Sequence, residues 1–438
     1  MFGNEQRVVI TGLGIATPLG IGPEANWAAL AEARSAIGKL KAFPLGDVHT
    51  TMAAEIDRFD LKTLAIPKHK KALIKNQKYM ARDIVLAVGT AELAIADAGL
   101  ADGGVDPTRF GLDLGAALIS TEIDELAPAI NTSTKADGEF DFTAWGRDGL
   151  PQILPIWLLR YLPNMLACHI GILNDCQGPS NTITEADAAS NVAISEATRI
   201  IQRGRADVMV TGGGDSKIHP LGYVRLGLFN VLTRQDTPET ACRPFHKDRD
   251  GWVPGEGAGI IILEEYEHAK KRGAKIYGEV LGCASACDAY GPGGLDPEGG
   301  GTEVAIRAAL KDAGLEPSQV GHVNAHGSAT QICDLAEARA FERVFGPEGV
   351  PVTALKGYMG NMGASCGAVE LICSLIGVNQ GMVPPAVHCD ELDPRCRVDL
   401  VRGAPRPTDN PIFVNTNLTR YGQAAAVVVR GNRGGTEY

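Results

Sequence analysis

A carboxylate stands where a predicted strand runs into a predicted helix. Residues 178–190 are typical of a β-strand that turns into a helix, and Asp187 lies at the turn, just before an alanine- and isoleucine-rich helix over residues 191–202. A helix N-terminus presents unpaired backbone N–H groups and the positive end of the helix dipole, so it stabilises an anion. A cysteine at this turn would be a thiolate of lowered pKa, ready to carry an acyl group. Asp187 is already an anion and is a poor acyl carrier.

The residue type of Asp187 leaves several roles open. It can be an ordinary helix-start anion held by backbone N–H groups, with no chemistry of its own. It can instead act as a base, or form a covalent acyl-aspartate. Glu185 adds a second carboxylate two residues earlier, and if both are buried, one of them is pushed toward protonation.

Alternating strands and helices must position this turn. The apolar runs that end in glycine are typical of strands in a sheet covered on both faces. The pattern predicts an α/β protein with two related halves, residues 1–273 and 274–438, which indicates an internal duplication without a direct sequence repeat. Strands are expected at 8–11, 111–119, 206–212, 257–263, 276–281, 322–325, 352–354, 412–416 and 424–429, and helices at 23–32, 77–98, 191–202, 302–313 and 332–344.

Composition narrows the class of function. The chain has 438 residues, 45% of them hydrophobic, and a net charge of −11 without a basic block, which argues against nucleic-acid binding. No apolar run reaches the roughly 18 residues of a membrane helix, and 153–173, the most hydrophobic stretch, is interrupted by prolines and an arginine. We expect that stretch to be a buried helix or part of a subunit interface. The ten cysteines show no CxxC spacing and no zinc pattern, so we expect free thiols, no metal and a cytoplasmic location.

Several motifs along the chain resemble one family of enzymes. They are found at 7–14 (RVVITGLG), 207–213 (DVMVTGG), 243–245 (RPF), 248–251 (DRDG), 255–259 (GEGAG), 263–274 (LEEYEHAKKRGA) and 323–327 (VNAHG). These resemble the condensing enzymes, the β-ketoacyl-acyl-carrier-protein synthases of the second type, and the resemblance extends from about residue 7 to residue 430. It implies the thiolase fold, with five alternating layers of helix and sheet (αβαβα) and the site between the halves.

The resemblance also implies roles for single residues. In the family a cysteine thiolate holds the acyl chain, two histidines bind the thioester oxygen as malonyl loses carbon dioxide, and a lysine and an acid complete the site. Asp187 stands in the place of the cysteine, His326 in that of the first histidine and Asn361 in that of the second. Lys356 matches the lysine, and Glu337 is its expected ion-pair partner. No cofactor and no metal is implied.

Asparagine in the place of the second histidine does not by itself remove the chemistry. A carboxamide donates a hydrogen bond to an oxyanion, and condensing enzymes of the third type use a histidine and an asparagine beside their cysteine. The pair His326 and Asn361 is therefore competent for decarboxylation, and the alternative is drift after the cysteine was lost.

The C-terminal loop also departs from the family pattern. The family carries a gating turn rich in glycine and phenylalanine, whereas this chain has Leu418, Thr419, Arg420 and Tyr421. Most of the flexible glycines that let such a backbone swing are absent. A gate that opens to admit acyl chains is not expected here.

These departures favour a non-condensing ketosynthase-like subunit, a chain-length factor that pairs with an active ketosynthase and serves an acyl carrier protein. Tunnel and interface contacts are expected within 140–172, and a basic face at 68–78 is either a carrier-docking patch or an ordinary solvated helix face. Two alternatives remain: a malonyl-carrier-protein decarboxylase that uses His326 and Asn361, and a homodimeric scaffold that holds acyl chains.

Overall fold

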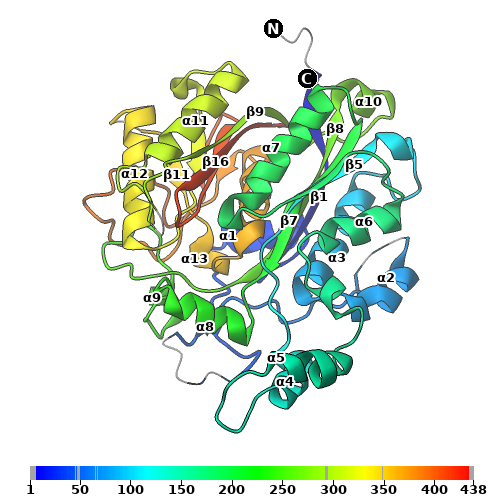
Figure 1. The fold of residues 1–438 in the computed structure, drawn as a ribbon. Helices are drawn as coiled ribbons and strands as arrows, with labels where there is room; N and C mark the ends of the chain where they lie inside the picture. Colours follow the sequence, from blue (N-terminus) through cyan, green and yellow to red (C-terminus); the bar gives the residue numbers. More distant parts are fainter. Residues whose placement is uncertain are drawn as a thin grey trace.

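The computed structural model describes residues 6–44, 46, 50–64, 66, 68–291, 294–347 and 349–433. Its main feature is a 12-stranded mixed sheet with the strand order β13-β11-β10-β15-β16-β9-β1-β8-β7-β5-β6, to which β2 adds by pairing with β1. Figure 1 shows this sheet running diagonally through the molecule, with helices on both sides of it.

Ten strands of this sheet form two sets of five. The first set is β1 (Val8–Thr17), β5 (Phe110–Gly115), β6 (Ser180–Ile183), β7 (Val208–Ser216) and β8 (Glu256–Glu265). The second set is β9 (Gly278–Cys287), β10 (His322–Asn324), β11 (Pro351–Thr353), β15 (Ile412–Leu418) and β16 (Gln423–Gly431). Short strands complete the list: β2 (Gly20–Ile21), β3 (Gly38–Lys39), β4 (Met52–Ala53), β12 (Met382–Val383), β13 (Asp399–Leu400) and β14 (Arg406–Pro407).

The two sets have the same topology. Read from the outer edge inward, the first is ordered β6-β5-β7-β8-β1 and the second β11-β10-β15-β16-β9. In each set the strands of the outer two pairings are parallel and those of the inner two are antiparallel. The innermost strands β1 and β9 pair with each other and join the sets. The duplication predicted from the sequence is therefore present in the strand order, and the predicted division after residue 273 falls between α10 (Tyr266–Lys271) and β9.

The helices occupy equivalent places in the two halves. Helices α7 (Ala189–Gln202) and α14 (Cys366–Asn379) pack on each other and each contacts strands of both sets, so they form the central layer. Helices α3 (Arg82–Asp97) and α6 (Met165–Asn174) cover the outer face of the first set, and α11 (Gly300–Ala313) that of the second, with α12 (Gln331–Phe345) packed on α11. The remaining helices are α1 (Pro23–Ala31), α2 (Lys70–Asn76), α4 (Ile123–Thr132), α5 (Phe142–Ala144), α8 (Pro220–Leu228), α9 (Pro238–Ala241) and α13 (Lys356–Met359).

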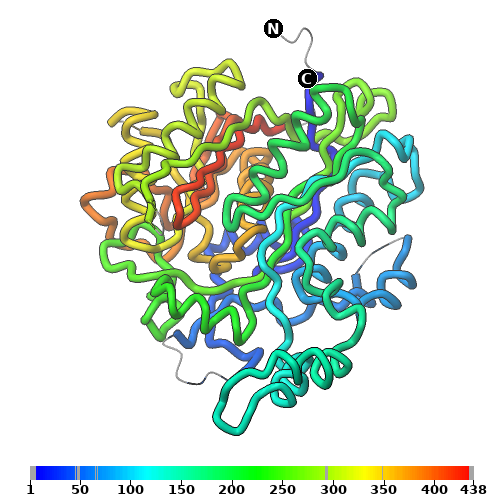
Figure 2. Tube along the Cα trace, in the orientation of Figure 1, coloured from blue at the N-terminus to red at the C-terminus, as the bar shows by residue number. Residues whose placement is uncertain are grey.

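The predicted elements exist, but their bounds and one burial prediction change. The helix expected over 77–98 is a 3-10 turn followed by α3, because Met80 takes an extended conformation between them. The stretch 153–173 is not a buried helix: it has a 3-10 turn at Trp157–Arg160 before α6, and Leu154 and Leu158 are exposed. In Figure 2 the chain from α4 to this turn forms a lobe at the bottom of the view. Within the described part of the chain, no helix has both the length and the apolar character that a membrane crossing needs.

Candidate functional site

The elbow that carries Asp187 joins β6 to α7. Asp187 lies in a 3-10 turn, Ala186–Ala188, that leads directly into α7, as the sequence predicts. Ala186 has a φ of 44°, in the left-handed region that non-glycine residues seldom adopt. Backbone strain of this kind persists only where the surrounding structure fixes it, and it is concentrated at functional sites. The elbow therefore keeps a conformation suited to presenting one side chain into the space between the halves.

The Asp187 side chain is surrounded by charged and amide groups. Its withdrawal from water raises the pKa of Asp187, while the nearby ammonium groups of Lys356 and Lys217 and a hydrogen bond from Asn361 lower it; the net shift is upward. Burial also raises the pKa of Glu185, and it does so without a contribution from Asp187. The proximity of Lys217 to Asp187 was not foreseen from the sequence, whereas Lys356 was expected in the same site.

On the other side of the site, Lys356 is at the centre of a fully bonded network. Its Nζ donates to Glu370 Oε1 at 2.6 Å, to the main-chain oxygen of His326 at 2.6 Å and to His326 Nδ1 at 3.1 Å. An ammonium has three N–H donors, and all three are used. We call His326, Lys356, Glu370 and Asn417 the C-terminal cluster; Asn417 Nδ2 donates to Glu370 Oε2 at 2.8 Å.

The predicted pairing of Lys356 with Glu337 is wrong. Glu337 instead accepts the main-chain N–H groups of His326 and Gly327, each at 2.8 Å. Burial raises the pKa of Glu337 to about 8, against the two main-chain N–H donors. The reason is topological: Glu370 projects from α14 in the central layer toward Lys356, whereas Glu337 on α12 meets the end of β10 from the outer side. Glu337 therefore fixes the loop that carries His326.

The contacts of His326 decide its tautomer. Burial and the adjacent Lys356 lower the pKa of His326 well below its usual value, so the ring is neutral at pH 7. Lys356 Nζ can only donate, so His326 Nδ1 accepts and the ring proton resides on Nε2. A neutral imidazole with an Nε2–H donor is the form that an oxyanion-binding histidine needs.

Asn361 accepts hydrogen bonds at its carboxamide oxygen and lies beside Asp187. Its Oδ1 accepts the main-chain N–H of Gly363 at 2.7 Å and the thiol of Cys366 at 3.7 Å. Its side chain is close enough to the carboxylate of Asp187 to lower the pKa of that group. The residue that matches the second histidine of the family therefore has a carboxylate of the protein itself as a neighbour.

A second group of ionisable side chains lies on the other side of Asp187. Lys217 Nζ contacts Asp215 Oδ2 at 2.6 Å, and Asp83 Oδ1 accepts the main-chain N–H of Ser216 at 3.0 Å. Burial and the neighbouring Asp215 raise the pKa of Asp83 to about 7. Asp215 Oδ1 is buried without a hydrogen-bond partner. We call Asp83, Asp187, Asp215 and Lys217 the N-terminal cluster.

Three asparagines tie the two halves together beside the site. Asn191 on α7 donates to Asn417 Oδ1 at 2.7 Å, and Asn415 donates to Asn191 Oδ1 at 3.0 Å. Asn415 and Asn417 belong to β15, so these amides link the helix of one repeat to a strand of the other. Asn417 also immobilises Glu370, and through it Lys356.

The segment predicted to have lost a gating function is a tight hairpin. Thr419 N–H donates to Gln423 O at 2.8 Å, and Gly422 N–H donates to Thr419 O at 3.0 Å. The Arg420 guanidinium stacks over the ring of Phe229, 4.1 Å from its centroid, and over that of Tyr421 at 4.7 Å. Leu418 and Thr419 are buried. These contacts hold the loop that a gate would have to move.

Each site residue that the sequence analysis missed has a local sequence feature that could have identified it. Glu370 is the one acidic residue in the otherwise apolar helix α14, which is the mark of a buried ion pair. Asn415 and Asn417 alternate on a buried strand, and Lys217 follows directly after the glycine-rich strand β7. The cysteines gave no further site: all ten are free, and burial raises the pKa of Cys366. No set of three or more metal-ligating side chains occurs among the residues that the structure describes.

The fold and this site define a class, the thiolase-fold condensing enzymes, in which a nucleophile elbow faces a histidine and a lysine across the two repeats. The family model "Beta-ketoacyl synthase, N-terminal domain" matches residues 5–269, and "Beta-ketoacyl synthase, C-terminal domain" matches residues 277–390. The chain is 33% identical to 3-oxoacyl-[acyl-carrier-protein] synthase 2 of Vibrio cholerae, covering 96% of this chain and 97% of that protein. It is 32% identical to the oxytetracycline polyketide putative beta-ketoacyl synthase 1 of Streptomyces rimosus, covering 97% of each. The chain belongs to the β-ketoacyl synthase family of fatty acid and polyketide synthesis.

Solved structures agree with this assignment. A beta-ketoacyl synthase from Burkholderia phymatum superposes with a TM-score of 0.86 at 29% identity, covering 98% of this chain and 100% of that one. The ishigamide ketosynthase/chain length factor gives a TM-score of 0.84 at 27% identity with the same coverage. The predicted thiolase fold is thereby confirmed.

Proposed function

We propose that this chain is a non-condensing member of the family, a chain-length-factor subunit that pairs with an active ketosynthase. The observation that carries the proposal is the pair Asp187 and Asn361. A carboxylate occupies the acyl-carrying position, and the amide that would bind the thioester oxygen lies beside that carboxylate. The chain therefore lacks a tether for the acyl group, and a carboxylate of its own competes for one of the two oxyanion donors.

The C-terminal cluster gives a reason, apart from catalysis, for this part of the site to persist. The C-terminal cluster is buried and every donor of Lys356 is satisfied. Removing one partner of a buried pair costs far more than the pair contributes, so this network is held in place by stability as well as by chemistry. An intact scaffold around an erased nucleophile is what a non-catalytic partner of an active subunit requires.

A group of exposed apolar side chains supports the proposal that a partner subunit binds this chain. Exposed large apolar side chains are concentrated in the segment from the end of β5 to α6, and exposed apolar side chains that gather in one region mark an interaction site. They are Leu118, Ile123, Ile130, Phe140, Phe142, Leu150, Leu154, Ile156, Leu158, Leu159 and Ile172. Strand β6 ends the sheet beside this surface with one edge unpaired among the described strands, and such an edge is a template for a strand of another chain. We propose that the partner ketosynthase covers both.

The proposed carrier contact rests on the face of α2 and the turn after it. Lys71, Lys75 and Lys78 are exposed there, and none of them forms an ion pair with an acidic side chain of the described residues. A carrier protein is acidic, so such a face attracts it even though the whole chain has a net charge of −11.

The first experiment asks whether the chain alone does chemistry. The purified protein is incubated with acyl- and malonyl-carrier proteins, and both chain extension and carbon dioxide release are measured. We expect no extension from the native chain, because Asp187 cannot hold the acyl group, and no carbon dioxide release, because a carboxylate beside Asn361 repels malonate. Extension by the native chain would overturn the proposal. Carbon dioxide release that is abolished by His326→Ala would support the decarboxylase alternative instead.

The second experiment asks what covers the apolar surface. The chain is co-expressed with the ketosynthase encoded nearest to it, and the assembly is measured by light scattering. We expect a heterodimer that Leu158→Asp disrupts. The matched control is Leu228→Asp on α8, a still more exposed leucine outside the surface, which leaves the heterodimer intact. A homodimer indifferent to the ketosynthase would favour the scaffold alternative.

A further inference from the structure

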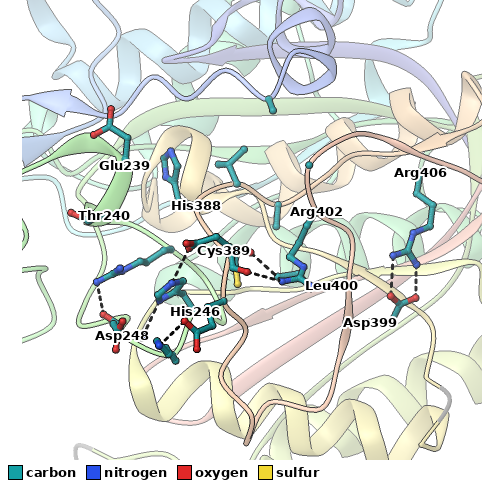
Figure 3. Close-up of a pocket in the computed structure, with 18 residues that line it drawn as sticks. Glu239, Thr240, His246, Asp248, His388, Cys389, Asp399, Leu400, Arg402 and Arg406 are labelled. Atoms are coloured by element: carbon teal, nitrogen blue, oxygen red, sulfur yellow. Dashed lines mark hydrogen bonds and ion pairs between the residues drawn. The ribbon is translucent and has the colours of Figure 1, made fainter.

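A separate cavity of about 1180 Å³ lies next to α13, the helix that begins with Lys356. It is formed by the segment from α9 to Asp248, the loop 386–391 and the chain between Asp399 and Arg406. Figure 3 shows its labelled side chains, with Glu239 and His388 toward one end and Arg402 and Arg406 toward the other. The volume is in the range of small-molecule sites, and no residue of the Asp187 site contributes to its lining.

The charges that line the cavity fall into two groups. Lys247 pairs with Glu391 at 2.5 Å, His246 with Asp390 at 2.9 Å, and Arg406 with Asp399. The guanidinium groups of Arg243 and Arg402, in contrast, form no ion pair with any carboxylate of the described residues.

The two unpaired guanidinium groups contact only main-chain oxygens. Arg402 Nη1 donates to the carbonyl oxygen of Asp390 at 3.2 Å and to that of Cys389 at 3.5 Å, as the dashed lines in Figure 3 show. Arg243 Nη2 donates to the carbonyl oxygen of Asp248 at 2.8 Å, and its Nε is buried with no hydrogen-bond partner. A buried cationic donor without a partner is costly, and an arginine fork is suited to a planar carboxylate or a phosphoryl group.

The loop that completes the cavity is strained. His388 has a φ of 62°, and its ring Nδ1 lies 3.2 Å from the carbonyl oxygen of Cys242, which fixes the ring against the segment that carries Arg243. Two unpaired carboxylates, Glu239 and Asp248, also line the cavity; both are exposed, as Arg402 is, so water screens their repulsion and the attraction of Arg402 alike, and Arg243 is the less exposed of the two arginines.

We propose that this cavity is a binding site for a small polar molecule with a phosphoryl or carboxylate group, and that Arg243 and Arg402 bind that group. The anion supplies negative charge beside two guanidinium groups that form no ion pair with a carboxylate of the described residues. His388 and Thr240 lie in the same lining and offer hydrogen bonds to the rest of the molecule.

The position of the cavity connects it to the site. Gly357, which follows Lys356 in α13, packs against Val387 and Cys242: a Cβ at Gly357 would lie 3.0 Å from Val387 Cγ2 and 3.3 Å from Cys242 O. Val387 lines the cavity. A ligand bound there therefore contacts the layer on which the lysine of the C-terminal cluster rests.

The test is calorimetric titration of the full chain at low ionic strength with inorganic phosphate and, separately, with succinate. We expect saturable binding of at least one of them, weakened roughly tenfold or more by Arg402→Gln and by Arg243→Gln, since each removes a charge-assisted hydrogen bond. The tighter of the two anions identifies whether the natural group is a phosphoryl or a carboxylate.

The matched control is Arg406→Gln, which removes a cavity arginine that already has a carboxylate partner and changes affinity less than twofold. Arg243→Lys keeps the charge and the fold but not the fork, and we expect it to weaken binding as well. The melting temperature gives a second readout, because the preferred anion raises it above the value in chloride of equal ionic strength. Absence of saturable binding of both anions, or equal binding by all variants, overturns the proposal.

Discussion

The C-terminal and N-terminal clusters face each other across the site and differ in how completely their charged groups are paired. In the C-terminal cluster Lys356 uses all its donors and Glu370 accepts from both Lys356 and Asn417. In the N-terminal cluster one lysine serves three carboxylates, and Asp215 Oδ1 has no partner. Buried carboxylate oxygens without a partner occur, among the described residues, in the N-terminal half alone, at Asp113 and Asp215.

The difference between the two clusters lies in how completely their charges are paired. A buried network whose hydrogen bonds are all made persists either because it still positions a site residue or because removing one of its members would destabilise the fold. A surplus of negative charge around the elbow is incompatible with a second anion, such as the malonyl carboxylate, at the same place. The departures from the family pattern fall in both repeats, Asp187 in the first and Asn361 with residues 418–421 in the second, but among the described residues only the first repeat leaves buried carboxylate oxygens without a partner.

The largest effect is expected for Lys356→Met. It leaves the buried carboxylate of Glu370 without its cation, and we expect the free energy of unfolding to fall by about 3–5 kcal/mol. Denaturant unfolding measures it. The control Lys75→Met changes an exposed lysine and stays within about 0.5 kcal/mol of the native chain. A loss below about 1 kcal/mol for Lys356→Met would show that the C-terminal cluster is not a tight network.

A smaller loss is expected for Lys217→Met. It removes the partner of Asp215 and the nearest cation to Asp83, and the carboxyl groups respond partly by taking up protons. We expect the free energy of unfolding to fall by about 2–3 kcal/mol at pH 7 and by less at pH 5. Equal losses for Lys217→Met and Lys356→Met at both pH values would remove the distinction between the clusters.

Asp113→Asn is expected to stabilise the protein in a pH-dependent way. Burial raises the pKa of Asp113 to about 7, and neither of its oxygens has a partner. The folded chain keeps a proton that the unfolded chain has already released, so this group lowers stability as pH rises from about 4 to about 7. The variant lacks that loss, and its advantage over the native chain grows by about 2 kcal/mol between pH 5 and pH 7.

Denaturant unfolding of the Asp113 variant and the native chain at the two pH values gives the comparison. The control Asp137→Asn, at an exposed turn, shows no such trend. An advantage for Asp113→Asn that is independent of pH would mean that the native carboxyl group is ionised in the folded protein at both pH values.

The smallest effect is expected for Asp187→Asn. The substitution removes the surplus charge, while Lys356 and Lys217 keep Glu370 and Asp215 as partners. Because the pKa of Asp187 is raised, we expect a gain of about 1 kcal/mol at pH 8 that disappears at low pH, where the native carboxyl group is protonated. Thermal unfolding of the variant and of the native chain, at pH 8 and at low pH, measures this gain. Destabilisation at pH 8 would mean that the lysines need Asp187 as their counter-charge.

Much of the fold was predictable from the sequence because its signals are local. Apolar runs ending in glycine located the central strands, and the strand-to-helix turn located Asp187. Motifs located His326, Lys356 and Asn361, which the structure brings together. The partner of Lys356 was not predictable from spacing, because Glu370 reaches it through the packing of α14 in the central layer. The proximity of Asn361 to Asp187 likewise joins two repeats whose contact no local pattern encodes.

The shared strand order of the two repeats has a consequence for how such a protein changes during evolution. The first repeat contributes Asp187 to the site and the second contributes His326, Lys356 and Asn361, so the residue at the elbow can change without altering the hydrogen-bond network around Lys356. A subunit of this design can lose its chemistry in a single step and still present a native surface to its neighbours.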